Sequence, residues 1–363
     1  MGRAMGPAVG GALGGMLATG PAQAADLPED RADLMYHSYI GGGVVATGPA
    51  VLVRKSLDDR VSLNASYYVD MVSNASIDVV TTASPYKEQR DERSVGLDYV
   101  YRDALITLAA SNSKEPDYTA DSASIDLAQD LFGGMTTVNV GYSRGWDTVG
   151  KHRDPTFSQP ANHWQYRFGV TQILTPRWLL SANVENISDQ GYLASPYRAA
   201  RVFGAAVPER DPATRTSRAL ALKVIGSVGE QASVRGEYRY FWDTWDVRAR
   251  TAELGYSRHL GPRWLVDGYG RYYSQGKALF YSDNFSTAMT YMSRNRQLGT
   301  FHSAALGAKG SYSAMRLASR YDITLNAALE HMRFHYDDFT DIRTGKLYSF
   351  DATVVELYVA ATF

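Results

Sequence analysis

The fold is constrained most strongly by a strict alternation of apolar and polar residues, which is clearest in the final segment of the chain, VVELYVAATF. Val355, Leu357 and Val359 fall on one side of this segment, and Glu356 falls on the other. Successive side chains of a β-strand point to opposite faces, so the segment predicts a strand with one apolar face and one more polar face. Such a strand lies between an apolar environment and a more aqueous one.

The same alternation recurs in residues 61–70, 95–101, 180–185 and 234–240. Alternating segments of roughly 10–14 residues run to an aromatic end, and a tilted strand needs about 9–11 residues to cross a bilayer. A soluble β-sandwich would also alternate, but its strands are usually shorter and its apolar face points inward. The pattern therefore favours an all-β fold, a transmembrane antiparallel β-barrel whose apolar side faces lipid.

The last residue, Phe363, gives a second indication of this class. A final alternating strand that ends in Phe resembles the terminal strand of bacterial outer-membrane barrels, where it serves as the assembly signal. The alternative is a buried sandwich strand that ends in Phe by chance. We expect the barrel assembly machinery to engage this strand.

The first residues indicate export. Arg3 is followed by an apolar stretch over residues 8–18 and by Ala22-Gln23-Ala24, which is the arrangement of a secretory signal peptide. We expect residues 1–24 to be removed and residues 25–363 to form a single barrel domain in the bacterial outer membrane. No run of about 18 apolar residues follows, so no membrane-spanning helix is expected.

Two nearly identical phrases, TPRWLL at 175–180 and GPRWLV at 261–266, mark equivalent places in the fold. Proline cannot donate a ladder hydrogen bond and belongs in a turn, whereas Trp belongs at the lipid–water boundary. Each phrase predicts a tight turn on one rim, with Trp178 or Trp264 as a girdle residue at the start of the next strand. Tyr272 would lie about 20 Å across the membrane from Trp264 on a tilted strand, so it is the expected girdle residue of the opposite rim.

Short and long connections alternate along the chain, as in barrels with short periplasmic turns and long external loops. Taking residues 34–46 as the first strand and Gly48-Pro49 as the first turn gives about sixteen strands and places both termini in the periplasm. The first strand is glycine-rich, and about fourteen strands is the alternative.

Charged residues occupy the polar face of these strands. On the lipid face each would cost a few kcal/mol near the midplane, so they are expected to face the lumen. Both signs occur, which suits passage of small polar or charged solutes, or a wall that holds a polar plug. The simpler interpretation is that they hydrate a wide barrel and pair across strands. The lumen and selectivity candidates are Asp70, Asp98, Asp126, Arg167, Glu185, Arg235, Glu237, Arg239, Glu253, Asp267 and Arg271.

The richest polar stretch, residues 67–93, is expected to form the top of one strand and a long external loop. Such a loop could fold into the barrel as a constriction, and its carboxylate, hydroxyl and amide oxygens could bind calcium. The usual spacing of a calcium loop is absent, so a solvated, self-paired loop is the alternative. The constriction candidates are Asp78, Glu88, Arg90, Asp91 and Arg93.

The sequence offers no sign of catalysis or of a resident cofactor. It contains no cysteine and neither a GxSxG nor an HExxH motif. His331 and His335 would lie about 13–14 Å apart on a strand, too far apart to hold one metal ion together. The formal net charge of −1 gives no electrostatic reason to expect nucleic acid. We therefore expect neither an enzyme nor a metal or cofactor site.

Residues 31–99, with ASIDVVTTASPY at Ala75–Tyr86 as the most specific part, resemble the opening of an uncharacterised bacterial family, number 3570 among the domains of unknown function. The resemblance implies an outer-membrane protein, often encoded beside a flavin transferase, a thioredoxin-like protein and a small lipoprotein. That implies a link to redox chemistry or cofactor handling at the envelope. It carries over no catalytic residue.

The leading hypothesis is thus an outer-membrane, porin-like channel for a small polar or charged solute. The competing hypothesis is a closed barrel scaffold that binds a periplasmic or surface partner, such as a lipoprotein, in an envelope redox or flavin-related system. About sixteen strands would leave room for water, whereas eight to ten would be filled by side chains. Outer-membrane lipid and the assembly machinery are the other expected partners.

Overall fold

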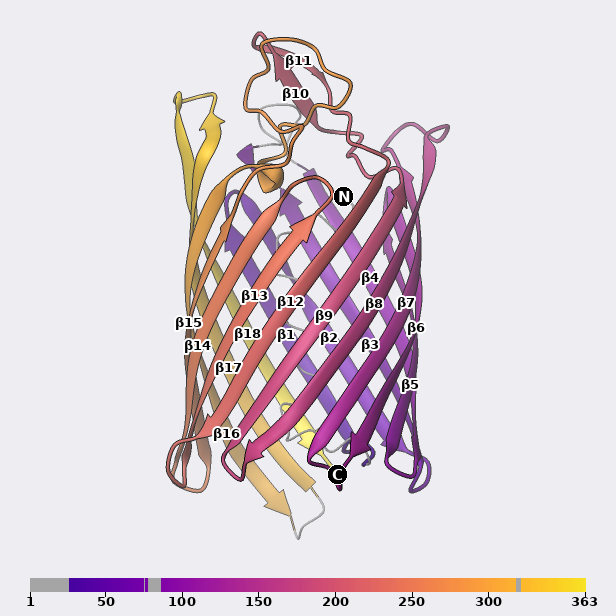
Figure 1. Ribbon diagram of the computed structural model, residues 1–363, viewed down its shortest axis with the longest axis vertical. Coiled ribbons are helices and arrows are strands. Elements are labelled where there is room, and N and C mark those ends of the chain that lie inside the picture. The colour runs from indigo at the N-terminus through magenta and orange to yellow at the C-terminus, as the bar shows by residue number, and fades with distance from the viewer. Residues whose placement is uncertain (1–25, 75, 78–85, 318–320) are drawn as a thin grey trace.

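The computed structural model describes residues 26–74, 76–77, 86–317 and 321–363. Sixteen antiparallel strands close into one barrel, and two further short strands form a separate sheet (Figure 1). The predicted all-β closed barrel and its strand number are confirmed. The expected signal peptide, residues 1–24, lies outside the described residues.

The barrel strands are β1 (Arg31–Gly41), β2 (Val44–Ser56), β3 (Val61–Asn74), β4 (Tyr86–Tyr101), β5 (Ala104–Glu115), β6 (Tyr118–Leu131), β7 (Thr136–Gly150), β8 (Ser158–Thr175), β9 (Trp178–Gly191), β12 (Thr214–Ser227), β13 (Ala232–Asp243), β14 (Arg248–Leu260), β15 (Trp264–Gln275), β16 (Phe301–Leu317), β17 (Tyr321–Asp341) and β18 (Lys346–Thr362). The separate sheet pairs β10 (Ala199–Val202) with β11 (Ala205–Pro208).

The ring is closed by β1, which pairs with β2 on one side and with β18 on the other. Each remaining strand pairs with its neighbours along the chain, except that β9 pairs with β12 because β10 and β11 project from the barrel. Short turns lie at one end of the barrel, the short-turn rim. The long connections lie at the other, the long-loop rim, together with the tight turns at 42–43 and 116–117 (Figure 1). The C-terminus lies at the short-turn rim.

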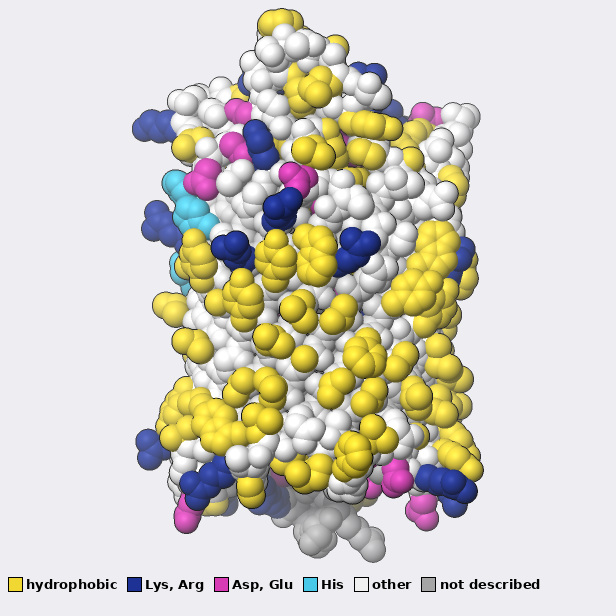
Figure 2. Space-filling model, viewed as in Figure 1, with side chains coloured by type: hydrophobic (Ala, Val, Ile, Leu, Met, Phe, Trp, Pro, Cys, Tyr) yellow, Lys and Arg dark blue, Asp and Glu magenta, His cyan; other side chains and the backbone are white. Residues whose placement is uncertain are grey.

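The outer face of the wall is apolar. Leu254 and Leu306 each leave 74% of their surface exposed, and Figure 2 shows apolar side chains in a broad band between the charged ends. Residues paired across antiparallel strands share a face, so the register carries the inner and outer assignment around the whole ring. In a soluble β-sandwich the apolar face points inward, whereas here it points outward. No helix among the described residues is long and apolar enough to cross a membrane.

The first hairpin differs from the sequence prediction. The chain turns at Gly42 and Gly43, which have φ of 58° and 80°, and not at Gly48-Pro49. Residues 34–46 therefore belong to two strands, and Gly48 lies within β2. Gly48 is needed there because a Cβ atom would overlap the carbonyl oxygen of Val69. Pro49 is tolerated because the β2–β3 pairing is interrupted beside it.

Two long connections, residues 192–213 and 276–300, fold together over the barrel mouth and are called the cap (Figure 1). Isolated bridges join Val202 to Phe285 and Arg210 to Met292. A small apolar core of Ala200, Phe285 and Met292 lies between the two connections. The short 3-10 helix η1 (Arg296–Leu298) leads the second connection back to β16.

Candidate functional site

The charged residues that were expected in the lumen all lie on the inner face of the wall. The register links Asp98 to Thr107, Thr107 to Asp126, and onward through Gly141 to Arg167 and Glu185. Following the register onward in the same way places the candidates on β13, β14 and β15 on the inner face. The inner-face candidates are Asp70, Asp98, Asp126, Arg167, Glu185, Arg235, Glu237, Arg239, Glu253, Asp267 and Arg271.

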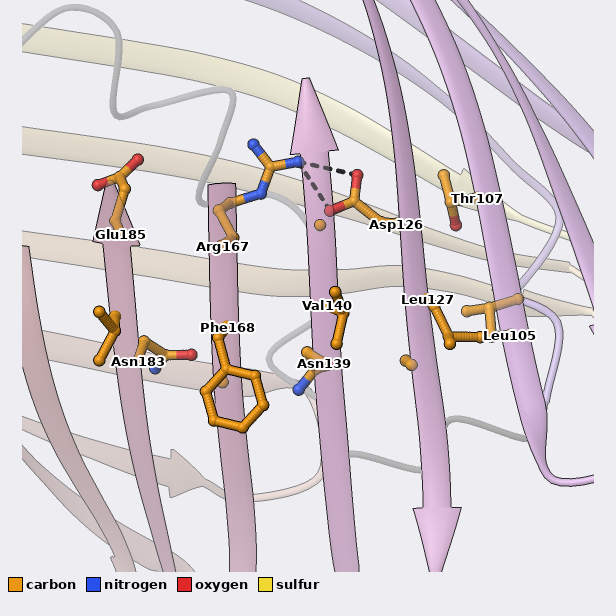
Figure 3. A pocket seen from close by; sticks show the side chains of 14 residues that line it. Leu105, Thr107, Asp126, Leu127, Asn139, Val140, Arg167, Phe168, Asn183 and Glu185 are labelled. Carbon is orange, nitrogen blue, oxygen red and sulfur yellow. Dashed lines mark hydrogen bonds and ion pairs between the residues drawn. The ribbon is translucent and has the colours of Figure 1, made fainter. Parts of the chain in front are cut away.

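Arg167 and Asp126 form an ion pair that spans an intervening strand. Nη2 of Arg167 on β8 lies 2.7 Å from Oδ1 of Asp126 on β6, and the two side chains meet across β7 (Figure 3). Gly141 is the β7 residue between them, and a Cβ atom there would overlap both partners. The guanidinium therefore lies along the wall, beside a hollow of about 340 Å³ lined mainly by inner-face residues.

The same arrangement recurs further around the ring, on β13, β14 and β15. Arg235 on β13 pairs with Asp267 on β15 and lies 3.5 Å from Glu253 on β14. Gly255 of β14 makes room, because a Cβ atom there would overlap the Arg235 guanidinium. Glycine on the middle strand thus lets ion pairs lie flat on the wall.

Three further pairs continue this network. Arg239 lies 3.3 Å from Glu185, Arg54 lies 3.6 Å from Asp98, and Arg271 pairs with Glu330. Sequence reasoning missed Arg54 and Glu330, although both continue the polar face of an alternating segment. The inner face of the wall consequently presents charges of both signs that pair with one another along the wall.

The prediction that Asp70 lines the lumen is wrong. Asp70 lies on the inner face, but its side chain is fully buried among neighbouring residues. Its Oδ1 is 2.7 Å from Nε2 of His37, and its Oδ2 is 3.0 Å from Nη2 of Arg90. Tyr68 stacks on the His37 ring with centroids 4.5 Å apart. Asp98 is also buried. These two carboxylates organise the wall and do not face the aqueous lumen.

A second buried polar cluster, which sequence reasoning missed, lies on β7, β8 and β9. Nδ1 of His163 is 2.6 Å from Asp189, and Nε2 is 2.9 Å from Asp147. Tyr118 also donates to Asp147. The sequence did indicate that His163 faces inward, because it lies four residues before Arg167 on the same strand and side chains alternate with a period of two.

The constriction candidates divide between the two faces. Asp78 lies outside the described residues, and Glu88 and Arg90 lie on the inner face of β4. Asp91 and Arg93 are corrections, because they lie on the outer face, where Asp91 accepts a hydrogen bond from the Tyr67 hydroxyl at 2.6 Å. The cause is that β4 already begins at Tyr86, so residues expected in a loop alternate as a strand.

One group of described residues has the geometry to hold a cation. Carboxylate oxygens of Glu88, Glu115 and Asp117 lie within 4.8 Å of one another. Asp117 also accepts a hydrogen bond from the hydroxyl of Tyr197 in the cap. Within the stretch 67–93 that was expected to supply calcium ligands, only Glu88 takes part in this group.

Described residues of two connections pack against wall residues near the long-loop rim. Ile77 packs on the inner-face aromatic residues Phe301, Tyr336 and Phe339, so this residue lies on the lumen side of the wall. The cap makes a second such contact, with Phe280 and Leu298 packed against Trp245. The cap was not foreseen from the sequence.

Arg294 fixes the cap to the wall. It is 6% exposed, and its Nη2 lies 2.6 Å from both the Thr340 carbonyl oxygen and Oδ1 of Asp283. Its guanidinium lies 4.3 Å from the centroid of the Phe339 ring, and its backbone N–H donates to Glu209. One buried side chain thus joins the cap to the hairpin of β17 and β18.

The expected girdle residues lie on the outer face at the two rims. Trp178 and Trp264 begin β9 and β15 at the short-turn rim, and Tyr272 lies toward the long-loop rim. The Trp264 ring packs 4.8 Å from that of Tyr312. Phe363 follows β18, and its ring lies 5.1 Å from Nζ of Lys55.

Comparison with known proteins gives one family. The model of a family described as a protein of unknown function (DUF3570) matches residues 77–162 and 151–328. No curated protein matches the chain.

Among solved structures, a bacterial polysaccharide outer membrane secretin has a TM-score of 0.52 and 10% sequence identity, over 93% of this chain and 100% of that one. Pseudomonas aeruginosa OpdK with vanillate has a TM-score of 0.45 and 10% identity, over 93% and 100% of the two chains. The likeness to the secretin shows the fold, which is that of outer-membrane barrels.

Proposed function

Since the chain belongs to the DUF3570 family of proteins of unknown function, we propose a function from the barrel itself, namely an outer-membrane channel for a small polar or charged solute. The expected family is thereby confirmed, by matches that begin at residue 77. The proposed location is the bacterial outer membrane, with the short-turn rim in the periplasm and the cap outside.

The observation that carries the proposal is the set of flat ion pairs on the inner wall. A barrel of about sixteen strands is wide enough for an aqueous interior. Arg167 with Asp126, and Arg235 with Glu253 and Asp267, lie along the wall and not across the lumen. A solute would meet both charge signs in a space that these side chains do not fill, which suits small polar or charged molecules.

A scaffold is the second candidate, and the cap favours it. The cap packs over the mouth and is fixed by the buried Arg294. A mouth closed in this way would leave the short-turn rim and the cap surface as binding sites for a periplasmic, lipoprotein or surface partner. A redox or flavin-related partner would then supply any cofactor.

Conductance of the folded barrel in a planar bilayer tests the two functions. A channel gives steady steps of reproducible size, and Arg235→Ala with Arg239→Ala shifts the current toward cations because two positive charges leave the wall. Arg258→Ala, on the outer face of β14, is the matched control and leaves ion preference unchanged.

Silence from a folded barrel would favour the scaffold. A variant in which a short glycine–serine linker replaces β10 and β11 separates two causes of silence. Steps from this variant would identify a channel closed by its cap, whereas continued silence would reject the channel.

A further inference from the structure

Three arginines lie close together on the outer face of the barrel at the long-loop rim. Arg218 is on β12, and Arg248 and Arg250 are on β14. Arg250 pairs with Ser274, and Ala252 pairs with the girdle residue Tyr272. Arg250 is therefore the next outward-facing residue of β14 beyond the level of Tyr272. These side chains are exposed, and Figure 2 shows basic side chains directly above the apolar band on this face. They therefore lie where the apolar band gives way to water.

Aromatic side chains lie between the three arginines. Trp242 of β13 is the partner of Arg218 on one side and of Arg248 on the other, and Tyr240 is the partner of Arg250. The Tyr240 and Trp242 rings stack with centroids 5.5 Å apart. Trp and Tyr favour the headgroup level of a membrane, so the arginines are held at the height of lipid headgroups.

The charge of this patch is not balanced within the protein. Arg248 has one acidic partner, Asp246, at 3.1 Å. Among the described residues, no ion pair is formed by Arg218 or Arg250, and their outer-face neighbours on β9, β13 and β15 are uncharged. Arg144, another outer-face arginine, is instead covered by the Trp164 ring at 4.3 Å. Arg218 and Arg250 thus remain available to an anion.

We propose that Arg218, Arg248 and Arg250, with Trp242 and Tyr240, bind the phosphorylated headgroup of a lipid in the outer leaflet. Guanidinium groups bind phosphate oxygens in a bidentate manner. Arg218 and Arg248 lie two strand spacings apart, about 10 Å, which suits a headgroup that carries two phosphates. The inference rests on the proposed membrane location and not on channel activity.

Native mass spectrometry of the folded barrel with added lipid A, a glycolipid with two phosphates, tests the site. Lipid A should bind, and its dephosphorylated form should bind far more weakly. The triple variant Arg218→Gln, Arg248→Gln, Arg250→Gln should bind lipid A roughly 100-fold more weakly, because each juxtamembrane arginine contributes severalfold. Arg258→Gln, on the outer face of β14 at the other rim, should bind normally.

Equal binding of both lipids, an unaffected triple variant or an equal loss in Arg258→Gln would each overturn the proposal. Competition by inorganic phosphate at the same concentration as lipid A would also overturn it, since it would indicate a site for free anions. Heat-dependent gel mobility verifies that each variant is folded. A barrel that binds lipid A but conducts no ions would contradict the channel alone, and a conducting barrel indifferent to lipid A would contradict this site alone.

Discussion

The wall and the cap of this barrel are stabilised in different ways. The wall consists of continuous antiparallel ladders in which each residue contributes a small, repeated share. The cap consists of two irregular connections that depend on a few contacts, above all those of Arg294. Damage to the wall should therefore affect the whole barrel, whereas damage to the cap should remain local.

The largest effect is expected at Gly48. Gly48→Val places side-chain atoms against the backbone of Val69, so the barrel should lose more than about 3 kcal/mol of unfolding free energy or fail to fold. Urea unfolding followed by gel mobility measures this loss, and Gly48→Ala should give a graded defect. Gly276→Val is the matched change in the cap, where a Cβ atom meets nothing within 4 Å. A loss at Gly276 as large as at Gly48 would contradict the contrast between wall and cap.

A local effect is expected when Arg294 is replaced. Arg294→Met leaves buried acceptors without their donor, so opening of the cap should become easier by about 3–5 kcal/mol. Hydrogen exchange should then accelerate in residues 276–300 while β17 stays protected. Arg167→Gln is the control within the wall, because Arg167 and Asp126 are 35% and 40% exposed as side chains and should change stability by less than about 1 kcal/mol. Faster exchange throughout the barrel in Arg294→Met would show that cap and wall unfold together.

A further local effect, which depends on pH, is expected from protonation within the cap. Burial, with repulsion from Glu209, raises the pKa of the Asp211 carboxyl to about 7. The folded cap therefore retains a proton that the unfolded cap loses near pH 4, so its stability should fall as pH rises from about 4 to about 7 and then level off. Proteolysis of the cap at about pH 5 and about pH 8, each relative to Asp211→Asn, measures this change. A ratio independent of pH would contradict it.

The wall was predictable from the sequence because alternation is a local property. Once one apolar residue such as Leu357 is assigned to the outer face, the period of two assigns its neighbours. The same reasoning placed Arg167 and Glu185 inside. It was wrong at Gly48-Pro49, because this dipeptide is a usual turn signal while Gly42-Gly43, which adopts the positive φ angles, was taken as strand.

The cap and the pairing of lumen charges were not predictable, because they depend on contacts between distant residues. Arg294 and Glu209 are 85 positions apart in the chain, and no periodicity connects them. Likewise, alternation places Arg271 inside but does not indicate that Glu330 on β17 is its partner. The prediction that Asp91 and Arg93 lie in a loop was wrong for a related reason. The residue at which β4 begins is decided by the pairing of β4 with β3.

The seam between β1 and β18 has a consequence for the order of folding. Arg31 pairs with Thr362, so the contact that closes the ring joins residues near opposite ends of the sequence. Hairpins such as β5–β6 need only neighbouring residues, whereas this closure carries the entropic cost of a loop that spans almost the entire chain. Until β18 arrives, β1 and the growing sheet would each present an unpaired edge capable of pairing with another chain. A factor that covers the unpaired edges of β1 and of the growing sheet until the seam forms would therefore protect a barrel of this kind from pairing with other chains.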